Sequence, residues 1–359
     1  MRRILVTGAG GVGGINFVRA LKSTFEDIYI VGTDYHYHYL LLSPVDERYK
    51  TPRHDDPNFI PLIRSIIKKH GIMFVHPQPE VEVEVLSQNK DSIPAKMLVP
   101  PPDVIKVARD KYLTYLKLKE RNVPVPKTFL CSSEEDIPDL VNKLGDKAWI
   151  RVRKGAGGKL SLPINTPEEA KLWVKLWCIK NIVTLEDFIV QEYLPGRDLA
   201  WDSLWYKGKL IASYTRERLA YIFPHVSPSR ITGTPTIARI VHNDEVNRVA
   251  IKAVKAIDPC PSGFYCIDLK EDENGTPKIT EVNIKAHTTL ALWSYAAVKA
   301  LRMDPIFNIP YLYLKLGLDE DDEVIELGTD IYPEGLTLIR HLDAGVILLT
   351  PQEERIRVL

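Results

Sequence analysis

Cysteine and long apolar runs are scarce in this chain. Only four of its 359 residues are cysteine: Cys131, Cys178, Cys260 and Cys266. No two of them form a Cys-x-x-Cys pair, so the spacing contains no zinc or redox motif and predicts structural thiols. No apolar stretch reaches the roughly 18 residues of a membrane span, and the apolar run near the N-terminus is too short for a signal peptide. The sequence therefore predicts a cytoplasmic protein without a membrane partner.

An excess of charge of either sign is also missing. The 47 basic and 47 acidic residues leave a formal net charge of zero. Such a chain has no overall field to draw it to nucleic acid or anionic lipid, so we expect no nucleic-acid partner and a small, specifically held ligand. The length exceeds what one hydrophobic core usually supports, which predicts two or three compact units with room for a cleft.

The N-terminal part alternates between strand and helix patterns. Apolar runs at residues 4–7, in "DIYIVGTD" and in "HGIMFVHPQP" predict strands, and helical periodicity separates them. This alternation is typical of a parallel, doubly wound sheet. The prolines of "MLVPPPDVIKVA" indicate where the unit ends.

The rest of the chain predicts antiparallel sheet. In "KAWIRVRKGAGGKLSLPI", residues that favour strands flank a glycine-rich turn. The alternating "DLAWDSLWYKGKLIASYTRERL" indicates a further β layer. The Asn274-Gly275 pair between "GFYCIDLKED" and "PKITEVNIKA" is a strong hairpin signal.

A glycine motif near the N-terminus favours a competing function. Gly8-x-Gly10-x-x-Gly13 follows the first strand, and Asp34 ends the second, as in proteins that bind a dinucleotide such as NAD. Glycines also allow any strand to turn tightly into a helix. The two Tyr-x-x-x-Lys pairs, at Tyr115 and Tyr311, do not lie where a short-chain dehydrogenase needs its proton donor. An NAD-dependent dehydrogenase is therefore an alternative function, and the rest of the sequence must show whether it holds.

Four later stretches resemble, in order and spacing, the ATP-grasp superfamily. They are "ARDKYLTYLKLKERNVPVPKT", "AWIRVRKGAGG", "VQEYLPGRD", and "IDL" followed by "ITEVNIKAHTT". They resemble one synthetase unit of the carbamoyl phosphate synthetase large subunit and its single-unit relatives, and "HPQPEVEVEVLSQNKD" fits the same likeness. The resemblance implies an α/β ATP-grasp fold with an N-terminal doubly wound, Rossmann-like (pre-ATP-grasp) domain.

The implied domains follow from this likeness. Residues 1–108 form the Rossmann-like domain, and 109–187 form a linker helix and a small lid lobe. Residues 188–305 form the large lobe with the metal ligands, and 306–359 form a C-terminal extension packed on the core.

The resemblance also implies a binding site for ATP. Phosphates need converging cations and a flexible loop whose backbone N–H groups can close over them. The residues that the family places around the nucleotide are Lys111, Arg151, Gly157, Gly158, Gln191, Glu192, Leu194 and Asp198. Asp198 is the least regular match, because relatives usually carry glutamate there.

Mg²⁺, with Mn²⁺ as an alternative ion, needs hard oxygen ligands. Asp268, Glu281 and Asn283 supply them, and Glu281 and Asn283 share one face of a strand. The family commonly reads Glu-x-Asn-Pro-Arg, and here Ile284-Lys285 replaces Pro-Arg. Lys285 keeps a positive charge near the transferred phosphoryl group but lacks the planar fork of arginine. We take Lys285 as a catalytic candidate, and its departure from the pattern predicts a reaction different from that of the synthetase or a partly degenerate site.

Acceptor recognition is assigned to three arginines. Arg216, Arg218 and Arg230 surround a loop where ATP-grasp ligases bind carboxylates, which suit bidentate guanidinium contacts. His287 follows the metal strand and is open to a phosphate-binding or a packing role. His36 and His38 are expected on one face of an extended segment that lines the cleft entrance, with no metal-ligating cluster beside them.

The implied function is an ATP-dependent ligase that activates a carboxylate as an acyl phosphate for attack by an amine or another nucleophile, such as a thiol. Its partners would be small molecules, and the resemblance leaves a homodimer open. A nucleotide-binding regulatory protein with degraded catalysis is an alternative, since Lys285 departs from the family pattern.

Overall fold

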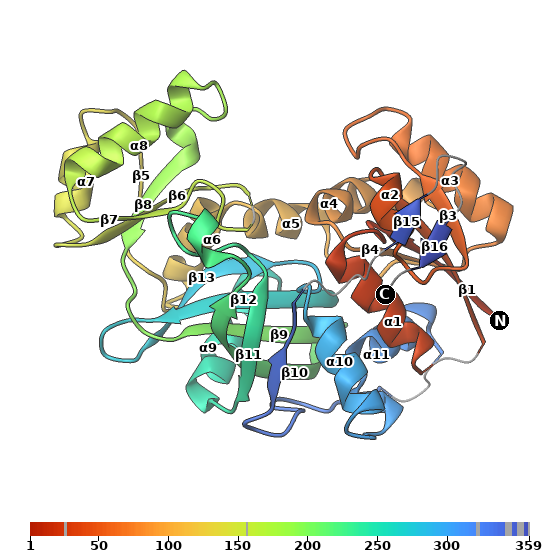
Figure 1. Ribbon diagram of the computed structural model, residues 1–359. Coiled ribbons are helices and arrows are strands. Elements are labelled where there is room, and N and C mark those ends of the chain that lie inside the picture. The colour runs from red at the N-terminus through yellow and green to blue at the C-terminus, as the bar shows by residue number, and fades with distance from the viewer. Residues whose placement is uncertain (25–26, 156, 321–323, 342–346, 350–354, 358–359) are drawn as a thin grey trace.

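The computed structural model describes residues 1–24, 27–155, 157–320, 324–341, 347–349 and 355–357. Figure 1 shows a parallel sheet with its helices, a small lobe at the opposite end, and a large antiparallel sheet below and between them. None of the helices in these ranges is both long and apolar enough to cross a membrane.

The N-terminal sheet is parallel, in the order β3-β2-β1-β4. Its strands are β1 (Arg2–Thr7), β2 (Ile28–Asp34), β3 (Glu47–Lys50) and β4 (Phe74–Pro77). Its helices are α1 (Val12–Lys22), α2 (Tyr37–Leu40), α3 (Phe59–His70), α4 (Glu80–Gln88) and the short η1 (Lys90–Ser92). Side chains of β1 alternate, so Ile4 packs in the cluster of α1 and Leu5 in that of α3. Helices thus cover both faces, which confirms the doubly wound sheet.

The small lobe is an antiparallel sheet covered by two helices. Its strands run in the order β5 (Thr128–Leu130), β8 (Phe188–Glu192), β6 (Ala148–Val152) and β7 (Leu162–Ile164). The helices are α7 (Ile137–Asn142) and α8 (Pro167–Ile179), and the short η2 (Leu185–Asp187) precedes β8. A glycine-rich loop joins β6 to β7, as predicted. The lobe has a hydrophobic core of its own around Ile150, Val174 and Phe188.

The large sheet has the order β13-β12-β9-β10-β11-β14. Its strands are β9 (Asp198–Tyr206), β10 (Lys209–Tyr221), β11 (Pro235–Val241), β12 (Gly263–Glu271), β13 (Pro277–Asn283) and β14 (Thr337–Ile339). Around it lie α5 (Pro102–Ala108), α6 (Lys111–Glu120), η3 (Pro224–Val226), α9 (Asp244–Ile257), α10 (Leu290–Lys299), η4 (Pro305–Phe307) and α11 (Ile309–Leu318). A separate ribbon pairs β15 (Ile347–Leu349) with β16 (Arg355–Arg357).

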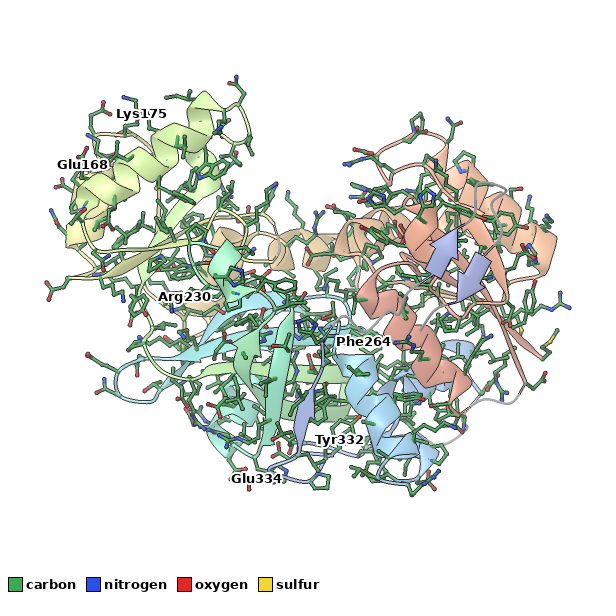
Figure 2. The ribbon with its side chains drawn as sticks, viewed as in Figure 1. Glu168, Lys175, Arg230, Phe264, Tyr332 and Glu334 are labelled. Atoms are coloured by element: carbon green, nitrogen blue, oxygen red, sulfur yellow. The ribbon has the colours of Figure 1, made fainter. Side chains whose placement is uncertain are left out.

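Two hydrophobic clusters join the N-terminal sheet to the large sheet. In one, Phe264 of β12 stacks on Tyr313 of α11 at 4.4 Å and meets Phe17 of α1 edge-on at 6.4 Å. Figure 2 labels Phe264 at this junction. These two parts therefore share cores, whereas the small lobe has its own. The domain boundaries derived from the sequence stay a prediction.

The structure corrects the prediction for the segment after β2. His36 and His38 do not lie in an extended segment, because residues Tyr37–Leu40 form the helical turn α2. The Asp34 carboxylate accepts the His36 N–H at 2.9 Å, and the His36 carbonyl accepts the Tyr39 N–H, so the chain turns at once. The cysteines are free, and Cys131 and Cys266 are buried while Cys260 is exposed.

Candidate active site

A pocket of about 780 Å³ lies between the small lobe and the large sheet. Strands β6 and β8, the segment after β8, and strands β9, β10, β12 and β13 all contribute to its wall. All but one of the site residues predicted from the sequence line it: Arg151, Gly157, Gly158, Gln191, Glu192, Leu194, Asp198, Arg216, Arg218, Arg230, Asp268, Glu281, Asn283 and Lys285. The exception, Lys111, is buried beside Glu281.

The end of the pocket beside β8 carries the residues expected at the nucleoside. Gln191, which lines the pocket, donates its side-chain amide to Thr128 at 2.9 Å. Glu192 accepts from Lys278 at 2.5 Å. Asp198 accepts from Tyr221 at 2.6 Å and from Arg218 at 3.1 Å. Each polar side chain is thus held by a neighbour and presents a defined edge to a ligand.

Cations from two elements meet at Glu281. Arg151 of β6 donates to one carboxylate oxygen at 2.9 Å, and the Lys111 ammonium lies 3.3 Å from the other. Lys111 also donates to the carbonyl of Gly155 in the glycine-rich loop at 2.8 Å. Burial would raise the pKa of the Glu281 carboxyl, but these two cations outweigh it and hold that pKa below its usual value. The small lobe and strand β13, which carries Glu281, are therefore joined through charged groups.

Asp268 and Glu281 face each other across the β12–β13 ladder, which confirms the predicted hairpin. The Asn283 amide nitrogen lies 3.4 Å from Asp268 and 3.1 Å from His287, so its carbonyl oxygen is the atom left to coordinate a cation. Burial would raise the pKa of Asp268, but Arg218 and His287 hold it at about 2. Two ionised carboxylates and one amide oxygen are a donor set that suits Mg²⁺.

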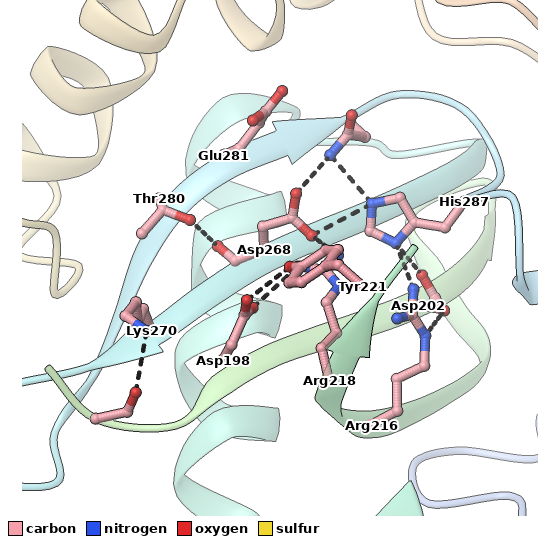
Figure 3. Close-up of polar contacts among 12 residues, drawn as sticks. Asp198, Asp202, Arg216, Arg218, Tyr221, Asp268, Lys270, Thr280, Glu281 and His287 are labelled. Carbon is pink, nitrogen blue, oxygen red and sulfur yellow. Dashed lines mark hydrogen bonds and ion pairs between the residues drawn. The ribbon is translucent and has the colours of Figure 1, made fainter. Parts of the chain in front are cut away.

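Behind these ligands lies a buried network that the sequence did not reveal (Figure 3). Asp202, which is fully buried on β9, accepts from Arg216 at 3.0 Å and from His287 at 2.5 Å. Burial would raise the pKa of Asp202, and the charges of Arg216 and His287 bring it well below its usual range. Cys266 lies close to Asp202 and His287, but Arg216 already neutralises this carboxylate. The sequence did contain one indication of this network: Asp202 stands inside the largely apolar run "LAWDSLWY", and a buried carboxylate needs a charged partner.

The predicted acceptor arginines differ in their surroundings. Arg216 is almost fully buried, and Arg218 lies between Asp198 and Asp268. Arg230 is exposed and lies in the loop between β10 and β11, between the small lobe and the large sheet (Figure 2). This loop packs against the glycine-rich loop so closely that a Cβ on Gly233 would lie 2.4 Å from Gly157 Cα. The two loops thus meet backbone to backbone over the pocket.

The protein's own side chains fill the space beside the glycines of the N-terminal motif. A Cβ on Gly8 would lie 2.3 Å from Pro79, and one on Gly13 would lie 2.7 Å from Gln78. The Asp34 carboxylate accepts the Gly10 N–H at 2.9 Å. These glycines serve tight packing, and Asp34 is already engaged with the backbone, so the geometry does not favour a dinucleotide here.

The sequence pattern of the ATP-grasp domain family matches residues 108–289. The chain belongs to the ATP-grasp family. This match covers the small lobe, the pocket and the metal strand, which confirms the resemblance drawn from the four motifs. The dehydrogenase alternative is thereby set aside.

Two curated relatives of this ATP-grasp protein are ligases. A glutamate–LysW ligase of Sulfurisphaera tokodaii is 26% identical over 183 residues, which are 50% of this chain and 62% of that protein. A tyramine–L-glutamate ligase of Methanocaldococcus fervens is 27% identical over 239 residues, which are 66% of each chain. The matches thus span less than two thirds of the relatives' own length.

Solved structures share the fold of the ATP-grasp protein. An L-amino acid ligase from Bacillus licheniformis has a TM-score of 0.67 at 13% identity and covers 89% of this chain and 74% of its own. The biotin carboxylase domain of the Hydrogenobacter thermophilus 2-oxoglutarate carboxylase, solved with MgADP, has a TM-score of 0.69 at 14% identity, covering 94% and 73%. Both confirm the ATP-grasp fold.

Proposed function

We propose that this protein is an ATP-dependent ligase that joins a carboxylate to an amine. The γ-phosphoryl group of ATP passes to a carboxylate oxygen, which forms an acyl phosphate and releases ADP. The amine nitrogen then attacks the acyl carbon, and the C–O bond to phosphate breaks. The observation that carries the proposal is the pocket between two lobes, whose wall holds Asp268 and Glu281, with Arg151 and the buried Lys111 both paired to Glu281.

The proposed nucleotide contacts follow the pocket from end to end. The segment Gln191–Leu194 and Asp198 hold the nucleoside, while Arg151 and the backbone of Gly157 and Gly158 bind the phosphates. Lys111, buried beside Glu281, adds its positive charge to theirs. Asp268, Glu281 and Asn283 would hold Mg²⁺, or Mn²⁺ in its place. When bound, this ion would offset charge on the phosphates.

The remaining cations act on the transferred group and the acid. Lys285 follows the metal strand and lines the pocket, where its ammonium can neutralise the transferred phosphoryl group. Arg230 and Arg216 suit the acid, and Arg218 positions Asp268 through their ion pair while remaining a candidate contact for the acid. The names of both relatives include glutamate. We therefore propose small-molecule substrates, with L-glutamate as the first acid to test.

A regulatory role is the second candidate, because Lys285 replaces the arginine of the family pattern. A sensor would bind ATP without acid-dependent turnover. ADP release with L-glutamate and tyramine, followed by a panel of other acids and amines, separates the two candidates. Release that requires both an acid and a nucleophile supports the ligase, and binding without release supports the sensor. The cytoplasmic location and the homodimer remain predictions from the sequence.

We expect MgATP to stabilise the protein against heat and NAD to leave it unchanged. A ligand at about 100 times its Kd stabilises the native state by about 2.7 kcal/mol, which corresponds to a rise in Tm of roughly 4 °C for a chain of this length. The measurement is thermal unfolding with MgATP, with NAD and with NADP. A shift with NAD and none with MgATP would contradict the assignment of the pocket.

A further inference from the structure

Glu80 is a carboxylate that the reaction described so far does not use. It begins α4, directly after the Gln78-Pro79 turn at the carboxyl end of β4. Open, doubly wound sheets bind ligands at the carboxyl ends of their strands. Glu80 therefore lies at the edge of the N-terminal sheet where a ligand is expected.

Two hydrogen bonds join this edge to the loop that follows the metal strand. The Gln78 side chain donates to the Ala286 carbonyl at 2.9 Å, and the Asn16 side chain donates to the Thr288 carbonyl at 3.4 Å. Gln78 is two residues before Glu80, and Ala286 is the residue after Lys285. The N-terminal sheet thus docks against the loop that follows Lys285, and Glu80 lies two residues from this contact without itself lining the pocket.

The Glu80 carboxylate has one ion-pair partner among the described residues, Arg109. Its nearest cation is Arg109, whose Nε lies 3.6 Å away and whose guanidinium pairs more closely with Glu84. Within the described ranges, no side chain donates a hydrogen bond to Glu80, and no ion pair within 4.0 Å joins it to Lys285. The side chain keeps 19% of its surface exposed. By contrast, Asp268 and Glu281, with similar exposure, each accept a hydrogen bond from an arginine.

We propose that Glu80 binds the amine nucleophile beside Lys285 and accepts its proton. This inference rests on the proposed ligase function. The amine arrives as an ammonium ion, gives one N–H proton to a Glu80 oxygen, and attacks the acyl carbon with the electron pair left on nitrogen. The new C–N bond replaces the C–O bond to phosphate, and the nitrogen passes its second surplus proton to the departing phosphate oxygen. Phosphate leaves on the side of Lys285.

The electrostatics around Glu80 suit both parts of this role. Burial raises the pKa of Glu80, and Glu281 adds to the rise, while Lys285, Arg109 and Lys111 oppose it. A base whose pKa is raised toward neutrality accepts a proton more readily than an ordinary carboxylate. Lys285 repels an ammonium ion. The negative charge of Glu80 offsets this repulsion, so a cationic amine can approach the phosphate that Lys285 binds.

The test compares Glu80→Gln with Glu84→Gln. Glu84 lies one turn further along α4 and pairs with the same Arg109, so it is a matched control for charge and folding. Wild type and variants are assayed with MgATP and L-glutamate, using either tyramine or hydroxylamine as nucleophile. Hydroxylamine is largely uncharged at neutral pH and traps an acyl phosphate as a hydroxamate without needing a base.

We expect Glu80→Gln to lower tyramine-dependent turnover about a hundredfold and to keep hydroxamate formation within about twofold of wild type, since activation of the acid does not involve the amine. Glu84→Gln should match wild type with both nucleophiles. Equal tyramine turnover in Glu80→Gln and wild type overturns the inference alone. Equal loss with both nucleophiles shows a structural role and also overturns it. No hydroxamate and no ADP from wild type overturns the proposed function, and the inference with it.

Discussion

Glu281→Gln should lower acid-dependent ADP release by at least about a hundredfold, because it removes a charge that the metal and the cations share. The amide is nearly isosteric, so the pocket keeps its shape. It cannot neutralise a divalent ion, and it leaves Lys111 and Arg151 without their shared carboxylate. The variant should also bind Mn²⁺ more weakly in the presence of ADP, which paramagnetic resonance of the ion measures independently of turnover.

Glu271→Gln is the control for this variant. Glu271 lies on the same hairpin, and it pairs with Arg197 at 2.6 Å and does not line the pocket. It loses the same charge from the same sheet, so any general effect on folding would appear in its Tm. A folded Glu281→Gln protein with wild-type ADP release would place the metal site elsewhere.

Lys285→Ala should lower kcat for ADP release about a hundredfold with little change in the KM for ATP. Its ammonium acts on charge that develops during phosphoryl transfer, and removing one such stabilising group has an effect of this size. Lys285→Arg restores the arginine of the family pattern. We expect it to keep turnover within about fivefold of wild type, since the charge is retained while the shape and donor geometry change.

The pair of Lys285 variants also separates a ligase from a sensor. In a ligase, kcat follows the charge at this position, so alanine is poor and arginine is active. If wild type and Lys285→Ala release ADP equally slowly, and Lys285→Arg raises the rate far above both, then the lysine marks a site whose catalysis has been lost. Both rates are measured with saturating ATP and acid.

Much of the geometry of the proposed metal site could be predicted because its determinants are local. The Asn274-Gly275 turn favours a hairpin, and the period of two places Glu281 and Asn283 on one face. The structure pairs Asp268 with Glu281, as that reasoning requires. The glycine-rich loop between β6 and β7 was predictable for the same reason, since its strands are neighbours in the sequence.

The contacts behind the ligands could not be predicted. Asp202 and His287 are far apart in the sequence, and they meet only because β12 lies between β9 and β13 and the chain then turns back. The Gln78–Ala286 hydrogen bond, which brings the start of α4 to the loop after Lys285, depends on how the N-terminal sheet docks. The prediction of an extended segment at His36 was wrong, because the Asp34 carboxylate accepts the His36 N–H and the chain turns into α2 there.

The sequence by itself determined the family, the alternation of strands and helices, and the residue types at the metal strand, because periodicity, turn chemistry and motif order are properties of short segments. Only the tertiary structure decided what the N-terminal glycines do. Their spacing suits a dinucleotide or a tight turn equally well, and Pro79 and Gln78 occupy the space beside them. It also decided which charges meet, since Asp202 of β9 and His287, which follows β13, are 85 residues apart and come together away from water only because β12 lies between those two strands.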